Sequence, residues 1–195
     1  MFVIVPLALA LHYWLDDPVD AEDMNGFSFV RTPGWTYLTE TSVGPSDGRI
    51  RFTREDLADA IRAGQNAPLF ALAKYARPQG GLNPAIGVNV AYERDAGAAT
   101  PRAVLERGMA ETATRVGDAL SVSEPLTTTT LAGLPAARVR YVSAASVNRG
   151  TTLIVYAVLI GRTSLLVAAA GAADGADAVD EPLQAFLGSL TVDHY

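Results

Sequence analysis

The stretch that decides the fold is Thr152–Ile160 (TLIVYAVLI), which is followed after Gly161 and Arg162 by Ser164–Ala170 (SLLVAAA). Nearly every position in both runs is apolar. Because successive residues of a strand point to opposite faces of a sheet, these runs predict strands that are buried on both faces. The two-residue connection predicts a tight antiparallel hairpin. We therefore expect a central hairpin that helices or a second sheet cover on both sides.

Shorter strands are predicted before and after this hairpin. The segment Ala136–Ala144 directs apolar side chains to one face and Arg138 and Arg140 to the other, and Ile86–Tyr92 alternates in a similar way. From Ala136 onward the pattern indicates a meander of three strands. Other strand formers are found at Phe27–Val30, Trp35–Leu38, Ile50–Phe52, Leu69–Tyr75 and Thr191–Asp193.

Three segments have the spacing of amphipathic helices. Thr53–Gly64 and Thr100–Gly117 each open on a threonine that can cap the first turn, and Pro101 follows the second of these caps. An apolar stripe ends at Leu190, and we expect its helix to begin at Asp180-Glu181-Pro182. The order of strands and helices predicts an α+β fold in which helices pack on the faces of a mostly antiparallel sheet.

Residues 2–15 (FVIVPLALALHYWL) form an apolar leader. The leader is shorter than the roughly 20 residues that span a bilayer, and Pro6 and His12 interrupt it. Three interpretations stay open. It is the hydrophobic region of a secretory signal with a small-residue site at Ala8-Leu9-Ala10, a truncated membrane anchor, or a first element packed on the core. No Lys or Arg precedes it, as one does in most signal peptides.

The domain division follows from this leader. Asp16–Asp23 (DDPVDAED) is acidic and contains proline, which predicts a solvated linker. We therefore expect a leader and linker over residues 1–24 and a single α/β domain over residues 25–195. Export to the periplasm or cell envelope is the favoured location, and the cytoplasm stays open as the alternative.

The composition bears on the class of partner. The chain of 195 residues has a formal net charge of −6, and Lys74 is its only lysine, so we expect no nucleic-acid partner and no membrane contact beyond the leader. It has no cysteine, which removes disulfides, thiol catalysis and cysteine-based metal sites. The two histidines, His12 and His194, lie near opposite ends of the sequence. We therefore expect neither a metal nor a cofactor.

Two pairs of side chains are candidates for binding. Arg138 and Arg140 lie two residues apart on one strand face, where two guanidinium groups can clamp a carboxylate or a phosphate. The alternative is that they pair with acids at the margin of the sheet, such as Glu93. Trp35 and Tyr37 also share a strand face. They are core aromatics by default and a recognition surface if they are exposed.

Two patterns typical of catalytic or metal sites have simpler explanations. Gly44–Gly48 (GPSDG) matches the G-x-S-x-G string of serine hydrolases, but a nucleophile at Ser46 needs a preceding strand and a histidine within reach. Pro45 favours a loop instead, so a hydrolase is the least favoured function. Acidic side chains before the last helix complement its dipole without any chemistry. These are Asp174, Asp177, Asp180 and Glu181.

Four features occur in a fixed order along the chain. They are Phe27-Ser28-Phe29 with Pro33-Gly34-Trp35, Gly133-Leu134-Pro135-Ala136 leading into Arg138–Tyr141, the long apolar hairpin, and Phe186 three residues before Ser189-Leu190. Together they resemble the PsbP-like superfamily from Asn25 to Val192. That superfamily includes the photosystem II subunit PsbP, Ran-binding Mog-type import factors and exported bacterial lipoproteins.

The resemblance implies an α/β/α sandwich around an antiparallel sheet, without a catalytic centre common to the family. The chain departs from the pattern in the segment Thr53–Pro84, which predicts an extra helix and a long loop, and in lacking a lipobox cysteine. We predict a non-enzymatic accessory or binding domain that acts outside the cytoplasm and docks to a partner protein or envelope complex. The alternative is a carrier of a small hydrophobic ligand, held between the sheet and the Thr100–Gly117 helix.

Overall fold

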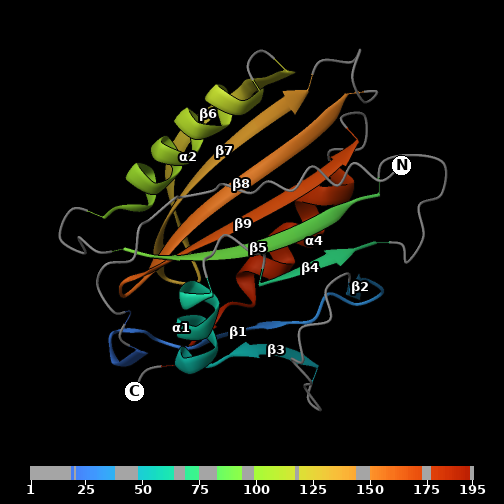
Figure 1. Ribbon diagram of the computed structural model, residues 1–195. Coiled ribbons are helices and arrows are strands. Elements are labelled where there is room, and N and C mark those ends of the chain that lie inside the picture. The colour runs from blue at the N-terminus through green and yellow to red at the C-terminus, as the bar shows by residue number, and fades with distance from the viewer. Residues whose placement is uncertain are drawn as a thin grey trace.

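Two antiparallel sheets and the helices around them form the described part of the molecule (Figure 1). The computed structural model describes residue 19 and residues 21–37, 48–63, 69–74, 83–93, 99–116, 119–143, 150–172 and 177–193. A short 3-10 helix, Ala21–Asp23, precedes the first strand. None of the described helices has the length and apolar character that a bilayer crossing requires.

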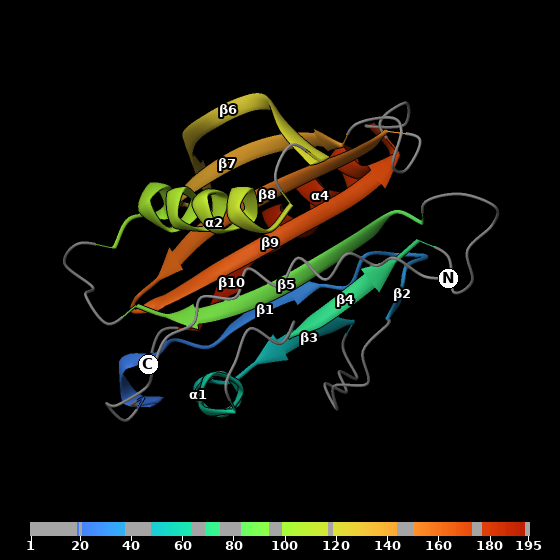
Figure 2. The ribbon, with the colours of Figure 1, turned by 45° about the horizontal axis from the view of Figure 1, so that its top comes forward.

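The larger sheet has seven strands, and the predicted hairpin lies well inside it (Figure 2). Across the sheet the strands are β2 (Thr36–Tyr37), β4 (Phe70–Ala73), β5 (Ala85–Tyr92), β9 (Thr163–Ala172), β8 (Thr151–Ile160), β7 (Leu134–Ser143) and β6 (Leu120–Leu131). Ile160 pairs with Thr163 around the two-residue turn, and Gly161 there has a φ of 59°. Glycine fits that position because it adopts positive φ without a steric cost. The central antiparallel hairpin is therefore confirmed.

The smaller sheet joins distant parts of the chain. Its strands are β10 (Thr191–Val192), β1 (Phe27–Val30) and β3 (Arg49–Phe52), all antiparallel. The ring of Phe29 stacks on that of Phe186 with 4.3 Å between centroids, and it also meets the Phe27 ring edge-on. This aromatic cluster holds the smaller sheet against the last helix, α4 (Asp177–Gly188).

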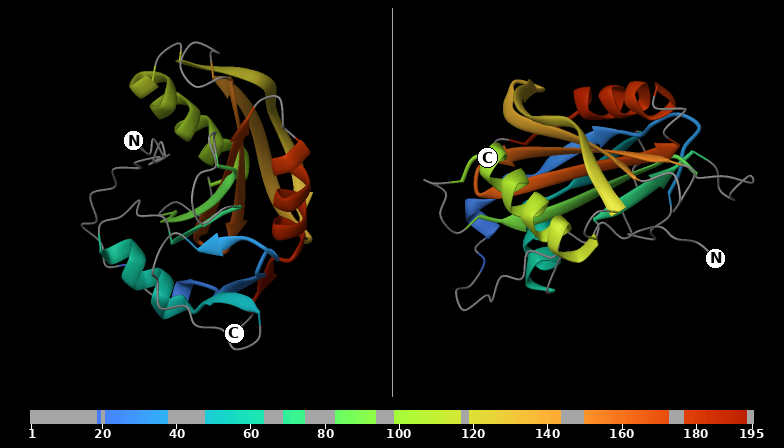
Figure 3. Two further views of the ribbon diagram at one scale, coloured as in Figure 1. Left: turned by 90° about the vertical axis from the view of Figure 1, so that its right-hand side faces the viewer. Right: turned by 90° about the horizontal axis from the view of Figure 1, so that it is seen from above.

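The central strands bury both of their faces. On β8, Ile154 and Tyr156 belong to the larger core, which the smaller sheet and α4 cover. Leu153 and Val155 point the other way, into a second core beneath α2 (Pro101–Val116). Figure 3 shows α2 and α4 on opposite faces of the large sheet. The layers are thus those of the expected α/β/α sandwich.

The helix caps follow the sequence closely. Thr53 and Asp56 form a capping box at the start of α1 (Arg54–Arg62). The Thr100 hydroxyl accepts a hydrogen bond from the Ala103 N–H at 3.1 Å and so caps α2. Both threonines satisfy backbone N–H groups that have no partner inside the helix.

Helix α4 begins earlier than the sequence predicts. It starts at Asp177, and Pro182 lies inside it rather than at its first turn. A proline in a helix interior costs about 3 kcal/mol, because its ring clashes with the preceding turn and it has no N–H. Val179 and Leu183 are fully buried, and this burial compensates for the proline.

The meander has four strands rather than the predicted three. The extra strand is β6, and it pairs with β7 around the Ala132-Gly133 turn. Most of its side chains are exposed, so it lacks the alternation that identifies a half-buried strand. The predicted stops at Gly64 and Gly117, most of the Arg77–Pro84 loop and the apolar leader lie outside the described residues.

Candidate functional site

The two candidate arginines of β7 lie on the face of the large sheet that α4 covers. In the ladder with β8, Arg138 is opposite Tyr156 and Arg140 is opposite Ile154. Both side chains are largely buried, with 23% of Arg138 and 16% of Arg140 exposed. Charged groups at that depth require partners.

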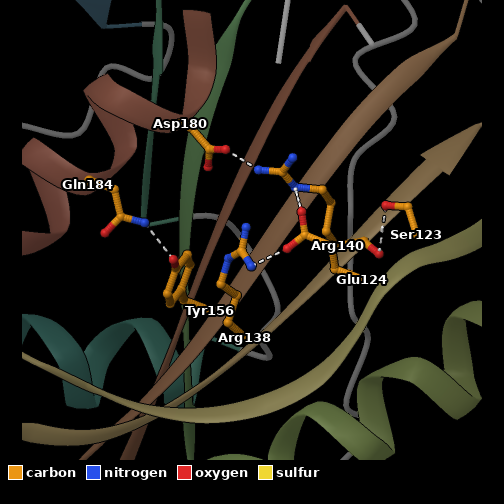
Figure 4. A network of polar contacts seen from close by, with 7 residues as sticks. All are labelled: Ser123, Glu124, Arg138, Arg140, Tyr156, Asp180 and Gln184. Atoms are coloured by element: carbon orange, nitrogen blue, oxygen red, sulfur yellow. Dashed lines mark hydrogen bonds and ion pairs between the residues drawn. The ribbon is translucent and has the colours of Figure 1, made fainter. Parts of the chain in front are cut away.

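Internal carboxylates supply those partners (Figure 4). Glu124 of β6 forms ion pairs with both arginines, through its Oε2 to Arg138 and through its Oε1 to Arg140 Nε at 3.1 Å. The second terminal nitrogen of Arg140 pairs with Asp180 of α4. Beside this cluster the Gln184 side chain donates a hydrogen bond to the Tyr156 hydroxyl at 2.6 Å. The network therefore ties β6, β7, β8 and α4 together.

Two irregularities in β6 bring Glu124 to this face. The register with β7 shifts between Val122 and Glu124 and again between Glu124 and Thr127. Each shift places one extra residue on β6, as a β-bulge does. As a result Val122 lies opposite Tyr141 on the α2 side, whereas Glu124 lies opposite Arg140 on the α4 side. The bulges are what allow an acid to reach the arginines.

The electrostatics of the network are balanced. Burial disfavours the charged form of Arg138, but the hydrogen bond to Glu124 and the nearby Tyr156 outweigh it, and the pKa of Arg138 is raised above its ordinary value. Two guanidinium groups face two carboxylates, Glu124 and Asp180, so the formal charges cancel. Arg138 Nε and Asp180 Oδ1 remain buried without a hydrogen-bond partner in the described part of the chain. The arrangement favours holding elements together over clamping an external anion.

The two arginines do pair with acids, as the alternative interpretation has it, but Glu93, the acid given as an example, is not one of them. Glu93 lies at the end of β5, where its carboxylate accepts two hydrogen bonds from Arg107 of α2 at 2.8 and 2.9 Å. Its side chain is only 6% exposed. Glu93 thus attaches α2 to the sheet, and the arginines of β7 use acids from β6 and α4 instead.

The aromatic pair Trp35 and Tyr37 is only partly described. Trp35 is 7% exposed and belongs to the larger core. Tyr37 pairs with Leu72 through its backbone, and the position of its side chain lies outside the description. Trp35 therefore packs as a core aromatic and offers no exposed face for recognition.

A small cavity lies between α2 and the sheet, where the sequence analysis places the pocket of a carrier. Its free volume is about 10 Å³, roughly the space of one water molecule. Burial raises the pKa of Tyr141, whose side chain lines the cavity and is 7% exposed. The lining residues are Leu105, Gly108, Met109, Thr112, Val139, Tyr141, Leu153 and Val155.

The remaining chemical candidates meet different outcomes. Ser46 and its G-x-S-x-G string lie outside the described residues apart from Gly48, as does Asp174. Asp180 pairs with Arg140. Within the described ranges, no group of three or more acids and histidines is arranged to hold a metal ion. Sequence analysis did not single out Glu124. The one signal for it in the sequence is that an acidic residue directly precedes a proline, Pro125, within a polar stretch.

No protein-family model and no curated protein matches the sequence of the chain. Solved structures do match its fold. The solution structure of cyanobacterial PsbP from Synechocystis sp. PCC 6803 superposes with a TM-score of 0.54, at 12% identity, over 89% of each chain. The chain has a PsbP-like fold.

A second structure shares this PsbP-like architecture. It is LpqN, described as involved in cell envelope biogenesis of Mycobacterium tuberculosis, with a TM-score of 0.58 and 16% identity. The match covers 92% of this chain and 87% of LpqN. At such identities the likeness establishes the fold, and the fold alone does not establish function.

Proposed function

We propose that this chain is a non-catalytic accessory domain that acts outside the cytoplasm and docks to a partner protein or complex of the cell envelope. The observation that carries this proposal is the PsbP-like fold, shared along most of the chain with LpqN, a protein involved in cell envelope biogenesis, and with cyanobacterial PsbP. The apolar leader over residues 2–15 supports export, because its length suits the hydrophobic region of a secretory signal.

The chemistry of the network is consistent with an accessory role. Arg138 and Arg140 are paired with Glu124 and Asp180, so these charges stabilise the sandwich. Both sides of the central hairpin are occupied by side chains of the two cores. With its interior filled, such a molecule offers its outer surface for recognition. Docking to a partner uses an outer surface, whereas catalysis usually takes place in an interior pocket.

Export is tested by fractionating cells that express the full chain with a C-terminal tag, beside a matched chain that lacks only the leader, residues 2–15. This deletion keeps Val19 and Met24, which are buried in the larger core. We expect the full chain in the extracytoplasmic fraction and the shortened chain in the cytoplasm. Export fails as an explanation if the full chain is recovered only from the cytoplasm with Met1 retained.

Docking is tested by chemical cross-linking in intact cells, followed by mass spectrometry of proteins joined to the exported chain. We expect the same envelope protein in independent preparations, joined through residues of the 25–195 domain. The control is an unrelated exported protein with the same tag, cross-linked in the same way. A partner that this control also captures contradicts docking.

A carrier of small hydrophobic ligands is the second candidate, and the cavity beneath α2 favours it. Eight residues line the cavity, and of the seven other than Tyr141 only Thr112 carries a hydroxyl, so the walls are mostly apolar. Because the free volume of about 10 Å³ is far below the several hundred Å³ of typical ligand sites, binding requires α2 to move outward. Native mass spectrometry of the freshly purified protein should then reveal a bound mass that is lost in Gly108→Leu. A protein without bound mass, and without a thermal shift on adding lipids, rejects the carrier.

A further inference from the structure

The outer half of β6, Thr127–Leu131, lies at the edge of the large sheet and has no neighbouring strand on its outer side among the described elements. β6 is the last strand of the large sheet and pairs only with β7. Its residues Thr127–Thr130 are all exposed. Threonine is a strong strand former, and four in a row favour an extended backbone at this edge.

The register shows which backbone groups of this edge point outward. Leu131 pairs with Leu134 around the two-residue turn Ala132-Gly133, which closes the hairpin with a hydrogen-bonded pair. In an antiparallel ladder such pairs alternate with pairs that share no hydrogen bond. Thr128 and Thr130 occupy the alternate positions, so their N–H and C=O groups are directed away from β7 toward the open edge.

The features that usually protect an edge strand lie elsewhere in β6. Edge strands are commonly blunted by charges, prolines and bulges. β6 has all three features, but none lies beyond Thr127. The charge of Glu124 and the proline at Pro125 come before it, and the second register shift ends at it. The run from Thr127 to Leu131 is uncharged and regular. The opposite edge of the sheet is different, because β2 has only two residues.

We propose that this edge pairs with the same edge of a second copy of the chain, which joins the two large sheets into one continuous sheet. The pairing is antiparallel around a twofold axis at Thr129. Thr128 then lies opposite Thr130 of the partner subunit, and Thr130 opposite the partner's Thr128. All four residues direct their N–H and C=O groups toward the other chain, so the register is self-complementary.

A second copy fits this edge because the register is self-complementary and the run carries no charge. Cross-strand Thr–Thr pairs are favourable, and no like charges face each other, because the run has none. The contact is short, however, and buries less than the roughly 1,200 Å² of a stable interface. The dimer is therefore weak and depends on protein concentration. This inference is independent of the envelope role, since a monomeric variant can still be exported and dock.

The test is an NMR dilution series with residue-resolved amide exchange, at protein concentrations from about 20 μM to about 1 mM. We expect concentration-dependent shifts centred on Thr127–Thr130. Exchange of the Thr128 and Thr130 amides should slow as the concentration rises. The Thr129 amide, already in the ladder with β7, should change little.

Two variants sharpen the test. Thr128→Lys with Thr130→Lys places like charges opposite one another in the dimer, and it should weaken association about tenfold or more while leaving the fold intact. Thr128→Val with Thr130→Val keeps the backbone groups and the strand propensity, and it should dimerise at least as well as the natural chain. The proposal is overturned if no shifts occur up to about 1 mM, if they centre on another surface, or if the lysine variant associates unchanged.

Discussion

Gly171 sets how closely helix α4 approaches the sheet. A Cβ atom at this position would overlap Cγ2 of Val179, a side chain that is fully buried. A valine in a helix has essentially one χ1 rotamer, so it cannot turn away. The absence of a side chain at Gly171 is therefore what allows Val179 to enter the larger core at the start of α4.

Gly171→Ala should destabilise the protein by about 1–3 kcal/mol, as overpacking a well-filled core does. Gly87→Ala is the matched control on the neighbouring strand, because a Cβ there meets nothing within 4 Å, and it should be neutral or slightly stabilising. Urea denaturation measures both. Equal effects of the two substitutions would contradict the close approach. The double variant Gly171→Ala with Val179→Ala should lose less stability than the sum of the two single losses, because the overlap is removed.

The arginine network contributes more stability than an exposed ion pair of the same type. Arg140→Ala should cost about 2 kcal/mol, because Asp180 loses its partner in a site where the Arg140 side chain is 16% exposed. This is below the cost at fully buried pairs, since 28% of Asp180 is exposed. The control is Arg102→Ala, whose pair with Glu106 is more than half exposed and should contribute about 0.3–0.5 kcal/mol.

A double-mutant cycle between Arg140 and Asp180 isolates their interaction. We expect a coupling energy clearly above that of the Arg102–Glu106 cycle. Equal coupling in the two cycles would mean that the pair of β7 and α4 is no more than a surface contact.

At the scale of elements, α2 packs on the sheet through one apolar face. Val104 and Leu105 are buried, Met109 is half-buried, and the pair between Arg107 and Glu93 adds a charged contact. The first turn of the helix is capped by Thr100.

Thr100→Ala should therefore destabilise the protein by about 1 kcal/mol, the usual cost of losing an N-cap side chain. Thr114→Ala is the control in the same helix. The Thr114 hydroxyl donates to the Ala110 carbonyl at 3.0 Å and caps nothing, so its removal should be neutral or slightly stabilising. Thermal unfolding of the two variants measures the difference, and a smaller effect at Thr100 than at Thr114 would contradict the capping role.

Elements that bury their side chains could be predicted from the sequence, and elements that do not could not. β8 and β9 are apolar at nearly every position, so their place in the centre of the sheet follows from composition. β6 is exposed along most of its length and is a strand because of its pairing with β7, which no local pattern encodes. The sequence predicts the start of α4 too late, because Pro182 is expected in the first turn of the helix. Burial of Val179 lets the helix begin earlier, although proline usually interrupts a helix interior.

The candidate site illustrates the same limit. The sequence correctly places Arg138 and Arg140 on one face of a strand, since strand periodicity fixes that relation. Their partners, Glu124 and Asp180, come from elements 14 and 40 residues away. Glu93 follows β5, which β9 and β8 separate from β7, so the strand order keeps it from the arginines. Two bulges in β6 bring Glu124 to them instead, and bulges leave no clear signal in composition.

At the scale of the whole molecule, the central hairpin lies between the two cores and contributes side chains to both. Each face of β8 belongs to one of them, and the smaller sheet, α1 and α4 complete the larger core. The sandwich should therefore unfold as one unit, with the hairpin as its most protected part. The resemblance to the PsbP-like fold is a consequence of this arrangement of layers.

Native-state hydrogen exchange of the purified chain, with the buried residues Val19 and Met24 retained, measures that property directly. Amides of Leu153–Leu159 and Leu165–Ala170 should exchange last, with opening free energies close to that of global unfolding, whereas β2 and the outer half of β6 should exchange early. Exchange of the hairpin amides as early as those of β2 would contradict burial on both faces, and with it the sandwich on which the proposed function depends.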